Sequence, residues 1–341
     1  MKTLIIRLDK LGDFYITLPY ISAIKRTLGK ENIDIIISEN IFDHFKEKKY
    51  LFNKIYSYPK SGIFKKLFLI YNLRLTKYQN IIVFDGKDKS LILSFFLRAL
   101  KKIIVLEKKK INFFLKILTL NKKKYHIKIN NLIDSYHILF TDVLSVINIK
   151  FINSDFNFLK HESLNTLDSI KSITNRLKNY TIIHLDEKWF SNLYIKNYED
   201  IKLTQENFLQ FIKKIISIKK TNLIITTGII YTRFLDDFTK LNLTKIENDL
   251  FHFDCDGYKL FFIKKTNIKE LEILTMNSNN LVTCNGPLTQ IASSFGVNII
   301  DIVEENLENW YSRHISNKKF YNSLFRKDFN KLSNEILLKI K

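Results

Sequence analysis

The feature that most constrains this chain is an alternation of short apolar runs with longer segments of helical periodicity. The short runs are rich in β-branched residues and predict strands at 3–8, 33–37, 80–84, 102–106, 180–185, 221–226, 280–283 and 298–302. The longer segments predict helices near 14–28, 63–76, 88–100, 131–146, 205–218, 231–240, 287–295 and 305–313. Strands that alternate with helices are typical of βαβ units around a parallel sheet, so the predicted fold class is α/β.

The length of the chain and a polar segment near its middle predict two domains. Its 341 residues exceed what a single hydrophobic core usually serves. Residues 150–180 are polar and irregular, and they separate the strands of the two halves. We therefore predict an N-terminal α/β domain at 1–165 and a C-terminal α/β domain at 166–318. The tail at 319–341 shows no strand pattern and predicts one or two basic amphipathic helices.

The net charge of +21 favours anionic partners, among them nucleic acid, anionic lipid and phosphorylated small molecules. Lysine makes up 47 of the 55 basic residues and is accompanied by many Ile, Asn, Phe and Tyr residues, so an AT-rich coding bias is an alternative origin of the charge. The lysines are scattered rather than gathered into a recognised module, which argues against a nucleic-acid partner. With 46% hydrophobic residues the chain is too apolar to be disordered.

Cysteine usage and the length of the apolar runs indicate the compartment. Cys255 and Cys284 are the only cysteines, too few for a disulfide framework or a cysteine zinc cluster, which favours a reducing compartment. Lysines interrupt the apolar runs before the ~18–20 residues that cross a bilayer, and the N-terminus carries no signal-peptide pattern. These observations predict a cytoplasmic protein.

Glycine is scarce enough for its positions to be informative. The chain has eight glycines, and Gly12, Gly228 and Gly286 each follow a predicted strand. Open α/β sheets bind their ligands beyond the carboxyl ends of the strands, so these three positions mark a candidate site. The alternative is that turns from strand to helix require glycine for structural reasons alone.

The first of these loops reads RLDKLGD at 7–13 and precedes a predicted helix. Asp13 stands at the start of that helix, where it is either a helix cap or a general base that faces the ligand crevice. Asp9 lies in the same loop, and Asp85 and Asp88 form an alternative acidic pair. The spacing matches neither a dinucleotide-binding G-x-G-x-x-G motif nor a P-loop.

The second half offers three comparable loops. The segment IIHLDEKWF at 182–190 contains Lys188, which is suited to neutralise a leaving phosphate, although a solvated loop lysine is the alternative. The strand at 221–226 leads into Thr226, Thr227 and Gly228. Gly286 and Pro287 open a predicted helix whose free N–H groups can hold a phosphate, with Asn285 as its cap.

Taken in order, these segments resemble the family 9 glycosyltransferases, the ADP-heptose:lipopolysaccharide heptosyltransferases and their relatives. The opening signature R-x-D-x-x-G-D stands here as Arg7-Leu8-Asp9-Lys10-Leu11-Gly12-Asp13, followed by Thr17-Leu18-Pro19. The segment G-P-x-x-H-x-A stands as Gly286-Pro287-Leu288-Thr289-Gln290-Ile291-Ala292, and Lys188-Trp189 matches a comparable pair. Three positions depart from the family: Cys284-Asn285 replaces Asp-Thr, and Gln290 replaces His.

The resemblance implies a GT-B fold, in which two Rossmann-like domains with parallel sheets face a cleft and a helix of the 319–341 tail packs back on the N-terminal domain. It implies an inverting, metal-independent glycosyltransferase without a cofactor, which moves a sugar from a nucleotide-sugar donor to a glycan or lipopolysaccharide-type acceptor. Asp13 would be the general base, with Asp9, Lys10 and Gly12 on the acceptor side. The donor-binding residues would be Lys188, Thr226, Thr227, Gly228, Asn285, Gly286, Pro287, Leu288, Thr289 and Gln290. The alternative is a catalytically inactive relative that binds a nucleotide sugar or a glycan.

Two basic apolar segments, 62–77 and 108–124, predict contact with an anionic membrane surface. On this interpretation the protein is peripheral on the inner face of the cell membrane. The alternative is that both segments form buried helices with solvated ends.

Overall fold

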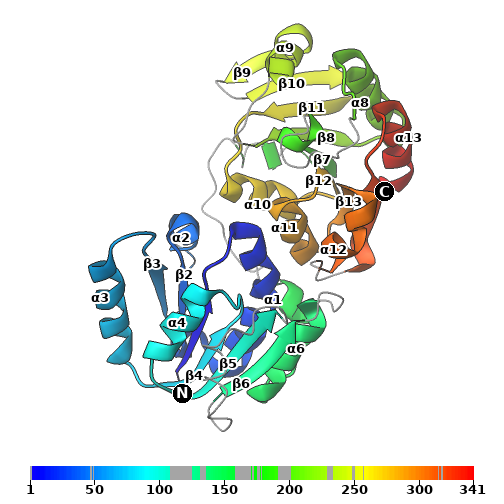
Figure 1. The fold of residues 1–341 in the computed structure, drawn as a ribbon. Coiled ribbons are helices and arrows are strands. Elements are labelled where there is room, and N and C mark those ends of the chain that lie inside the picture. The colour runs from blue at the N-terminus through cyan, green and yellow to red at the C-terminus, as the bar shows by residue number, and fades with distance from the viewer. Residues whose placement is uncertain are drawn as a thin grey trace. The chain divides into compact units, whose positions relative to one another are not determined.

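The computed structural model consists of two compact units, Met1–Phe158 and Leu159–Lys341 (Figure 1). The division falls a few residues before the boundary predicted at 165. The structure describes residues 2–46, 48, 50–107, 125–130, 136–157, 170, 173–174, 177, 179–190, 201–228, 233–247, 250–255, 257–313, 315 and 318–341. The predicted membrane segment 108–124 lies outside these residues, as does most of the predicted linker.

The N-terminal unit contains a parallel six-stranded sheet of order β3-β2-β1-β4-β5-β6. The strands are β1 (Thr3–Arg7), β2 (Ile33–Ser38), β3 (Lys54–Tyr58), β4 (Tyr78–Val83), β5 (Ala99–Glu107) and β6 (Tyr125–Asn130). All five residues of β1 are buried, as expected for a central strand with helices on both faces. The strand order reverses between β1 and β4, which makes the carboxyl ends of these two strands the expected ligand position of this unit.

Helices cover both faces of this sheet. They are α1 (Leu11–Leu28), α2 (Glu39–Phe45), α3 (Ile63–Arg74), α4 (Asp88–Phe96) and α6 (Tyr136–Val146). Leu4 and Ile6 of β1 share one core cluster with residues of α3 and α4. On the other side α1 and α6 pack together, and the rings of Tyr20 and Phe140 lie 5.0 Å apart.

The C-terminal unit contains an eight-stranded sheet of order β14-β13-β12-β7-β8-β11-β10-β9. Its strands are β7 (Tyr180–Leu185), β8 (Asn222–Thr227), β9 (Thr244–Glu247), β10 (Leu250–Cys255), β11 (Tyr258–Ile263), β12 (Asn280–Cys284), β13 (Asn298–Val303) and β14 (Tyr321–Phe325). The six strands from β14 to β11 are parallel, whereas β9 and β10 extend the sheet with antiparallel pairing. The order reverses between β7 and β12, so the loops after these strands mark the second expected ligand position.

The helices of this unit are α8 (Gln205–Lys219), α9 (Arg233–Asn242), α10 (Ile268–Met276), α11 (Pro287–Phe295), α12 (Glu308–Ser312) and α13 (Phe329–Lys339). Capping boxes open α8 and α10, in which Thr204 and Asn267 accept backbone N–H groups of the first turn. Proline stands at the first position of α11, and Gly296 ends this helix in the left-handed conformation.

The α/β fold class and the alternating elements are confirmed, and the structure corrects several details. Strands β3, β6, β9, β10 and β11 and helices α2 and α10 were not predicted. The helix predicted near 88–100 ends at Phe96 because β5 begins at Ala99. The tail is not purely helical, because β14 pairs in parallel with β13.

The tail packs on the C-terminal unit, which corrects the expectation that it returns to the N-terminal domain. Helix α13 buries Phe329, Leu332 and Ile336 in the core cluster that α8 also lines. Lys219 at the end of α8 donates a hydrogen bond to the carbonyl of Ile340, 2.7 Å away. The apolar face of α13 is therefore occupied within its own unit.

Among the described residues, the structure contains no helix that is both long enough and apolar enough to cross a membrane.

Candidate functional site

The loop after β1 is held by a buried arginine. Arg7 donates hydrogen bonds to the carbonyls of Phe84 (2.6 Å) and Asp13 (2.8 Å). Its guanidinium also lies 3.3 Å from the carboxylate of Asp9, which forms a second ion pair with Lys87. Arg7 thereby joins β1, the loop after β4 and the first turn of α1. The Asp9 carboxylate thus forms ion pairs with two cations, Arg7 and Lys87. Lys10, the N-cap of α1, is exposed.

Asp85 joins the loops after β1 and β4. Its carboxylate accepts hydrogen bonds from the Leu8 N–H (2.6 Å), the Ser90 hydroxyl (2.8 Å) and the Lys87 N–H (3.1 Å). Burial raises the pKa of Asp85, and these donors stabilise its charged form. Asp85 is thus tied into the fold, and the alternative acidic pair of Asp85 and Asp88 is not favoured as a site.

Asp13 lies in the first turn of α1, and the interpretation of Asp13 as the helix cap is wrong. The helix begins at Leu11 with Lys10 as its N-cap, so Gly12 and Asp13 are the second and third helical residues. No hydrogen bond or ion pair to the Asp13 carboxylate is found within the described part of the chain. Burial raises its pKa, while the nearby Arg7 lowers it. A half-buried carboxylate with raised proton affinity suits a general base.

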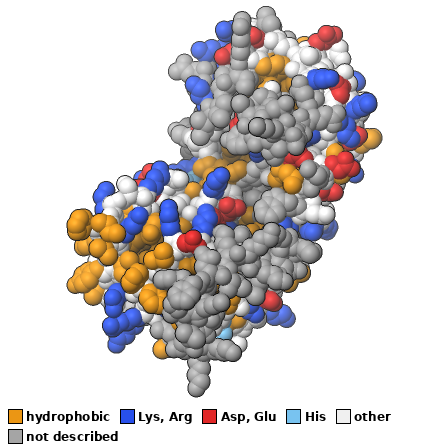
Figure 2. Space-filling model, viewed as in Figure 1, with side chains coloured by type: hydrophobic (Ala, Val, Ile, Leu, Met, Phe, Trp, Pro, Cys, Tyr) orange, Lys and Arg blue, Asp and Glu red, His pale blue; other side chains and the backbone are white. Residues whose placement is uncertain are grey.

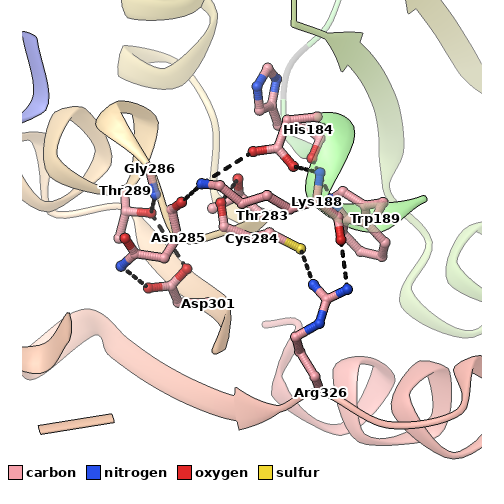
Figure 3. Close-up of polar contacts among 11 residues, drawn as sticks. His184, Lys188, Trp189, Thr283, Cys284, Asn285, Gly286, Thr289, Asp301 and Arg326 are labelled. Carbon is pink, nitrogen blue, oxygen red and sulfur yellow. Dashed lines mark hydrogen bonds and ion pairs between the residues drawn. The ribbon is translucent and has the colours of Figure 1, made fainter. Parts of the chain in front are cut away.

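In the C-terminal unit, the loop after β7 positions Lys188. Asp186 caps the short helical turn Glu187–Trp189 by accepting the Lys188 N–H at 3.1 Å. The Lys188 ammonium lies 3.5 Å from the Asp186 carboxylate and contacts the carbonyl of Asn285 (Figure 3). Trp189 is buried and donates its indole N–H to the carbonyl of His184 at 2.9 Å, which anchors the turn on β7.

The loop after β12 is organised by Asp301 of β13. The Asn285 amide (3.1 Å) and the Tyr321 hydroxyl (3.0 Å) both donate to one carboxylate oxygen of Asp301, and the Thr289 hydroxyl lies 3.5 Å from the other. Asn285 therefore does not cap α11. Gly286 is the N-cap, and its N–H donates to the Thr289 hydroxyl at 3.3 Å.

Glycine at position 286 leaves room beside the ammonium. A Cβ added to Gly286 would lie 3.6 Å from Nζ of Lys188, and one added to Gly228 would lie 3.9 Å from Cβ of Asp186. The N-terminus of α11 and the Lys188 ammonium thus adjoin at the carboxyl ends of β12 and β7. A helix N-terminus with an adjacent cation is suited to bind a phosphate or diphosphate.

The ionisable groups around Lys188 have shifted pKa values. Burial raises the pKa of Asp301 to about 7, despite the hydrogen bonds from Asn285 and Tyr321. Burial raises the pKa of Asp186 to about 6, against the lowering effect of Lys188. Burial lowers the pKa of His184 to about 4, and the charge of Lys188 adds to this shift. At neutral pH the site therefore holds a neutral imidazole and a partly protonated Asp301.

The other predicted donor-binding side chains, except Pro287, are turned to structural partners or to the core. Thr226 is fully buried with its hydroxyl 2.9 Å from Nδ1 of His184. The hydroxyl of Thr227 accepts the Lys265 N–H at 2.9 Å. Leu288 and Gln290 are buried in α11, and Oε1 of Gln290 has no hydrogen-bond partner among the described residues. Pro287 is exposed at the helix start.

Sequence reasoning missed three residues that shape this site. Asp301, Tyr321 and Arg326 reach it from β13, β14 and the segment after β14. Arg326 donates to the carbonyl of Lys188 at 2.6 Å and lies 3.6 Å from Sγ of the buried Cys284 (Figure 3). Asp301 could have been found from the sequence, because it lies within the apolar run NIIDIV. A carboxylate buried in a strand needs hydrogen-bond donors around it.

The fold class is that of GT-B proteins, because each of the two units is a Rossmann-like α/β layer structure with a strand-order reversal at its central strands. No protein-family model matches the chain, and no curated protein matches its sequence.

Solved structures of the same fold are found among glycosyltransferases. A family 9 glycosyl transferase from Veillonella parvula DSM 2008 has a TM-score of 0.63 at 10% identity, covering 100% of this chain and 90% of that chain. The E. coli heptosyltransferase WaaC with ADP has a TM-score of 0.62 at 12% identity, covering 99% and 100%. The E. coli ADP-heptose lps heptosyltransferase II has a TM-score of 0.60 at 10% identity, covering 100% and 98%. The chain thus has the fold of the family that its motifs resemble.

Proposed function

We propose that this protein is a glycosyltransferase that binds a nucleotide-sugar donor through its C-terminal unit. The observation that carries the proposal is the Lys188 ammonium beside the N-terminus of α11 at the strand-order reversal. A heptosyltransferase of the same fold was solved with ADP, which supports a nucleotide as the ligand. In the proposed donor complex, the diphosphate takes over Lys188 from the carbonyl of Asn285 and accepts the backbone N–H of Leu288 in the first turn of α11.

The proposed reaction is an inverting transfer to a hydroxyl of a glycan or lipopolysaccharide-type acceptor. Asp13 takes the proton of the acceptor hydroxyl while that oxygen bonds to the anomeric carbon from the face opposite the leaving group. The bond from the anomeric carbon to the diphosphate breaks, and the diphosphate leaves with the electron pair. Lys188 and the dipole of α11 stabilise its charge, a role that requires no metal.

The proposal requires that residues 9–13, 186–189, 226–228 and 284–290 line one cleft. This arrangement stays a prediction, as do a cytoplasmic location and work at the inner face of the membrane.

A catalytically inactive binder is a second candidate. It is favoured by Cys284, a buried thiol where the resembled family carries an aspartate. This form would hold the nucleotide sugar in the same place without transferring the sugar.

A panel of nucleotide sugars tests both candidates. We expect one donor to raise the melting temperature, because a ligand at 100 times its Kd stabilises a protein by about 2.7 kcal/mol. Release of the nucleoside diphosphate in the presence of glycan acceptors then distinguishes enzyme from binder. Stabilisation without release across all acceptors would favour the inactive binder, and no stabilisation by any donor would contradict both.

A further inference from the structure

Helix α3 is apolar on two opposite sides. Leu69 and Leu73 are buried in the core cluster of the N-terminal unit. On the opposite side four large apolar side chains are exposed: Phe64 (83%), Leu67 (54%), Phe68 (67%) and Tyr71 (61%). Their spacing of three and four residues forms a continuous stripe along the helix. Only one of these two apolar sides packs on the core of the N-terminal unit, and the other is exposed.

The stripe continues into a larger apolar surface. Figure 2 shows hydrophobic side chains gathered over α3 and the neighbouring α4. Leu75 after α3, Phe96 of α4 and Leu100 of β5 are also exposed. Between these elements lies an open groove of about 580 Å³, lined by Leu67, Tyr71, Leu75, Phe96, Arg74 and Arg98. A contiguous apolar surface of this kind marks an interaction site.

The charges on α3 and its flanking residues have one sign. Residues 60–77 contain five basic residues and no acidic residue. Arg74 and Arg98 are exposed and line the groove, and Lys65 is exposed beside the apolar stripe. The occupant must therefore be apolar and must carry negative charge at the same face.

The charge pattern favours a membrane over a second copy of this chain. In a two-fold symmetric dimer the same patch meets itself, which would place these basic side chains opposite one another without an acidic partner. A bilayer with anionic lipids presents phosphates at its surface and acyl chains beneath them, and so complements both features.

We propose that the α3–α4 face docks on an anionic lipid bilayer. Phe64, Phe68 and Tyr71 enter the boundary between headgroups and acyl chains, while Lys65, Arg74 and Arg98 contact lipid phosphates. The contact is independent of the sugar-transfer proposal and needs neither donor nor acceptor.

Vesicle cosedimentation of the full chain tests this face. The vesicles contain either phosphatidylcholine alone or equimolar phosphatidylcholine and phosphatidylglycerol. The double variant Phe64→Ser, Phe68→Ser removes two apolar anchors from exposed positions. Its matched control is Ile218→Ser, Leu338→Ser, which changes two exposed apolar residues (63% and 81%) on helices of the C-terminal unit. Melting temperatures verify that both variants fold.

We expect the parent to bind the anionic vesicles and to bind phosphatidylcholine weakly. The Phe64/Phe68 variant should bind at least about tenfold more weakly, because two phenyl groups are no longer transferred from water into the bilayer. The control should bind like the parent. The charge variant Arg74→Gln, Arg98→Gln should weaken binding at low ionic strength, with the loss shrinking at high salt.

Equal binding by the Phe64/Phe68 variant and its control would overturn the proposal. Equal binding of the parent to both vesicle types would remove the role assigned to the basic residues. A dimer in sedimentation velocity that dissociates in the Phe64/Phe68 variant, without a change in vesicle binding, would assign the face to a second copy instead.

Discussion

The loops after β1 and β7 occupy equivalent places in their two sheets and present opposite charges. In the N-terminal unit, Asp9 forms ion pairs and Asp85 accepts hydrogen bonds from N–H groups. Asp13 provides a carboxylate whose pKa is raised. In the C-terminal unit, Lys188 stands beside a helix N-terminus. The shared topology determines where each loop lies. The local side-chain partners determine whether the loop provides a general base or binds an anion. Four predictions follow this comparison, from the largest expected effect to the smallest.

Replacing Asp13 by Asn tests the base at the N-terminal loop. We expect the sugar-transfer rate to fall by about 100-fold or more, since general-base assistance is typically worth that much. Donor binding and the melting temperature should stay near the parental values, because the carboxylate is not the helix cap. Asp88→Asn, at the exposed start of α4, is the matched control. An Asp13→Asn protein with parental turnover would remove Asp13 from the mechanism.

Replacing Lys188 by Gln tests the cation at the C-terminal loop. Loss of a charge-assisted contact to the diphosphate should weaken donor binding by about ten- to a hundredfold, the equivalent of about 1.5–3 kcal/mol. Titration calorimetry with the stabilising donor measures the effect, and Lys213→Gln on the exposed side of α8 serves as control. Unchanged affinity would show that the diphosphate does not contact Lys188.

Asp301 should make stability depend on pH. Its pKa is raised to about 7 from 3.8, so it favours the folded state most below about pH 4, and this stabilisation is lost as pH rises through about 7. The slope is at most about 1.4 kcal/mol per pH unit for one group. The free energy of unfolding of the parent and of Asp301→Asn can be measured with urea between pH 4 and 8. The difference between the two proteins should change with pH by this slope.

His184 contributes the opposite slope, because its pKa is lowered to about 4 from 6.5 and its stabilisation is lost as pH falls through about 4. His184 is present in both proteins, so the difference between them isolates Asp301. Parallel stability profiles would indicate that Asp301 keeps an ordinary pKa.

Replacing Asp9 by Asn should give the smallest effect. The charge of Asp9 raises the pKa of Asp13, so its removal should move the acidic limb of the pH profile of kcat/KM to lower pH. Asp43→Asn is the control, since its ion pair with Lys46 lies on the surface of α2. A shift to higher pH, or none, would show that Asp13 does not govern this limb.

The architecture was largely predictable because it depends on local pattern. Periodicity located β7 at 180–185 and α11 at 287–295 with the bounds that the structure has. The hairpin of β10 and β11 escaped prediction, although the Asp256-Gly257 dipeptide is a common hairpin signal. The strand β14 was missed because its residues are only half buried at the edge of the sheet, so no apolar run marks it.

The sequence by itself determined the α/β class, the alternation of the central strands with helices, and the strand ends near which Asp13, Lys188 and Gly286 lie, because turns and buried strands leave a local signature. Only the tertiary structure decided which carboxylates accept hydrogen bonds or form ion pairs. Asp85 and Asp13 look alike in sequence, yet Asp85 accepts the N–H of Leu8, 77 positions away. Asp301 likewise receives its donors from two separate segments, residues 285–289 and β14. Hydrogen bonds and burial between distant segments set these pKa values, and no local pattern encodes them.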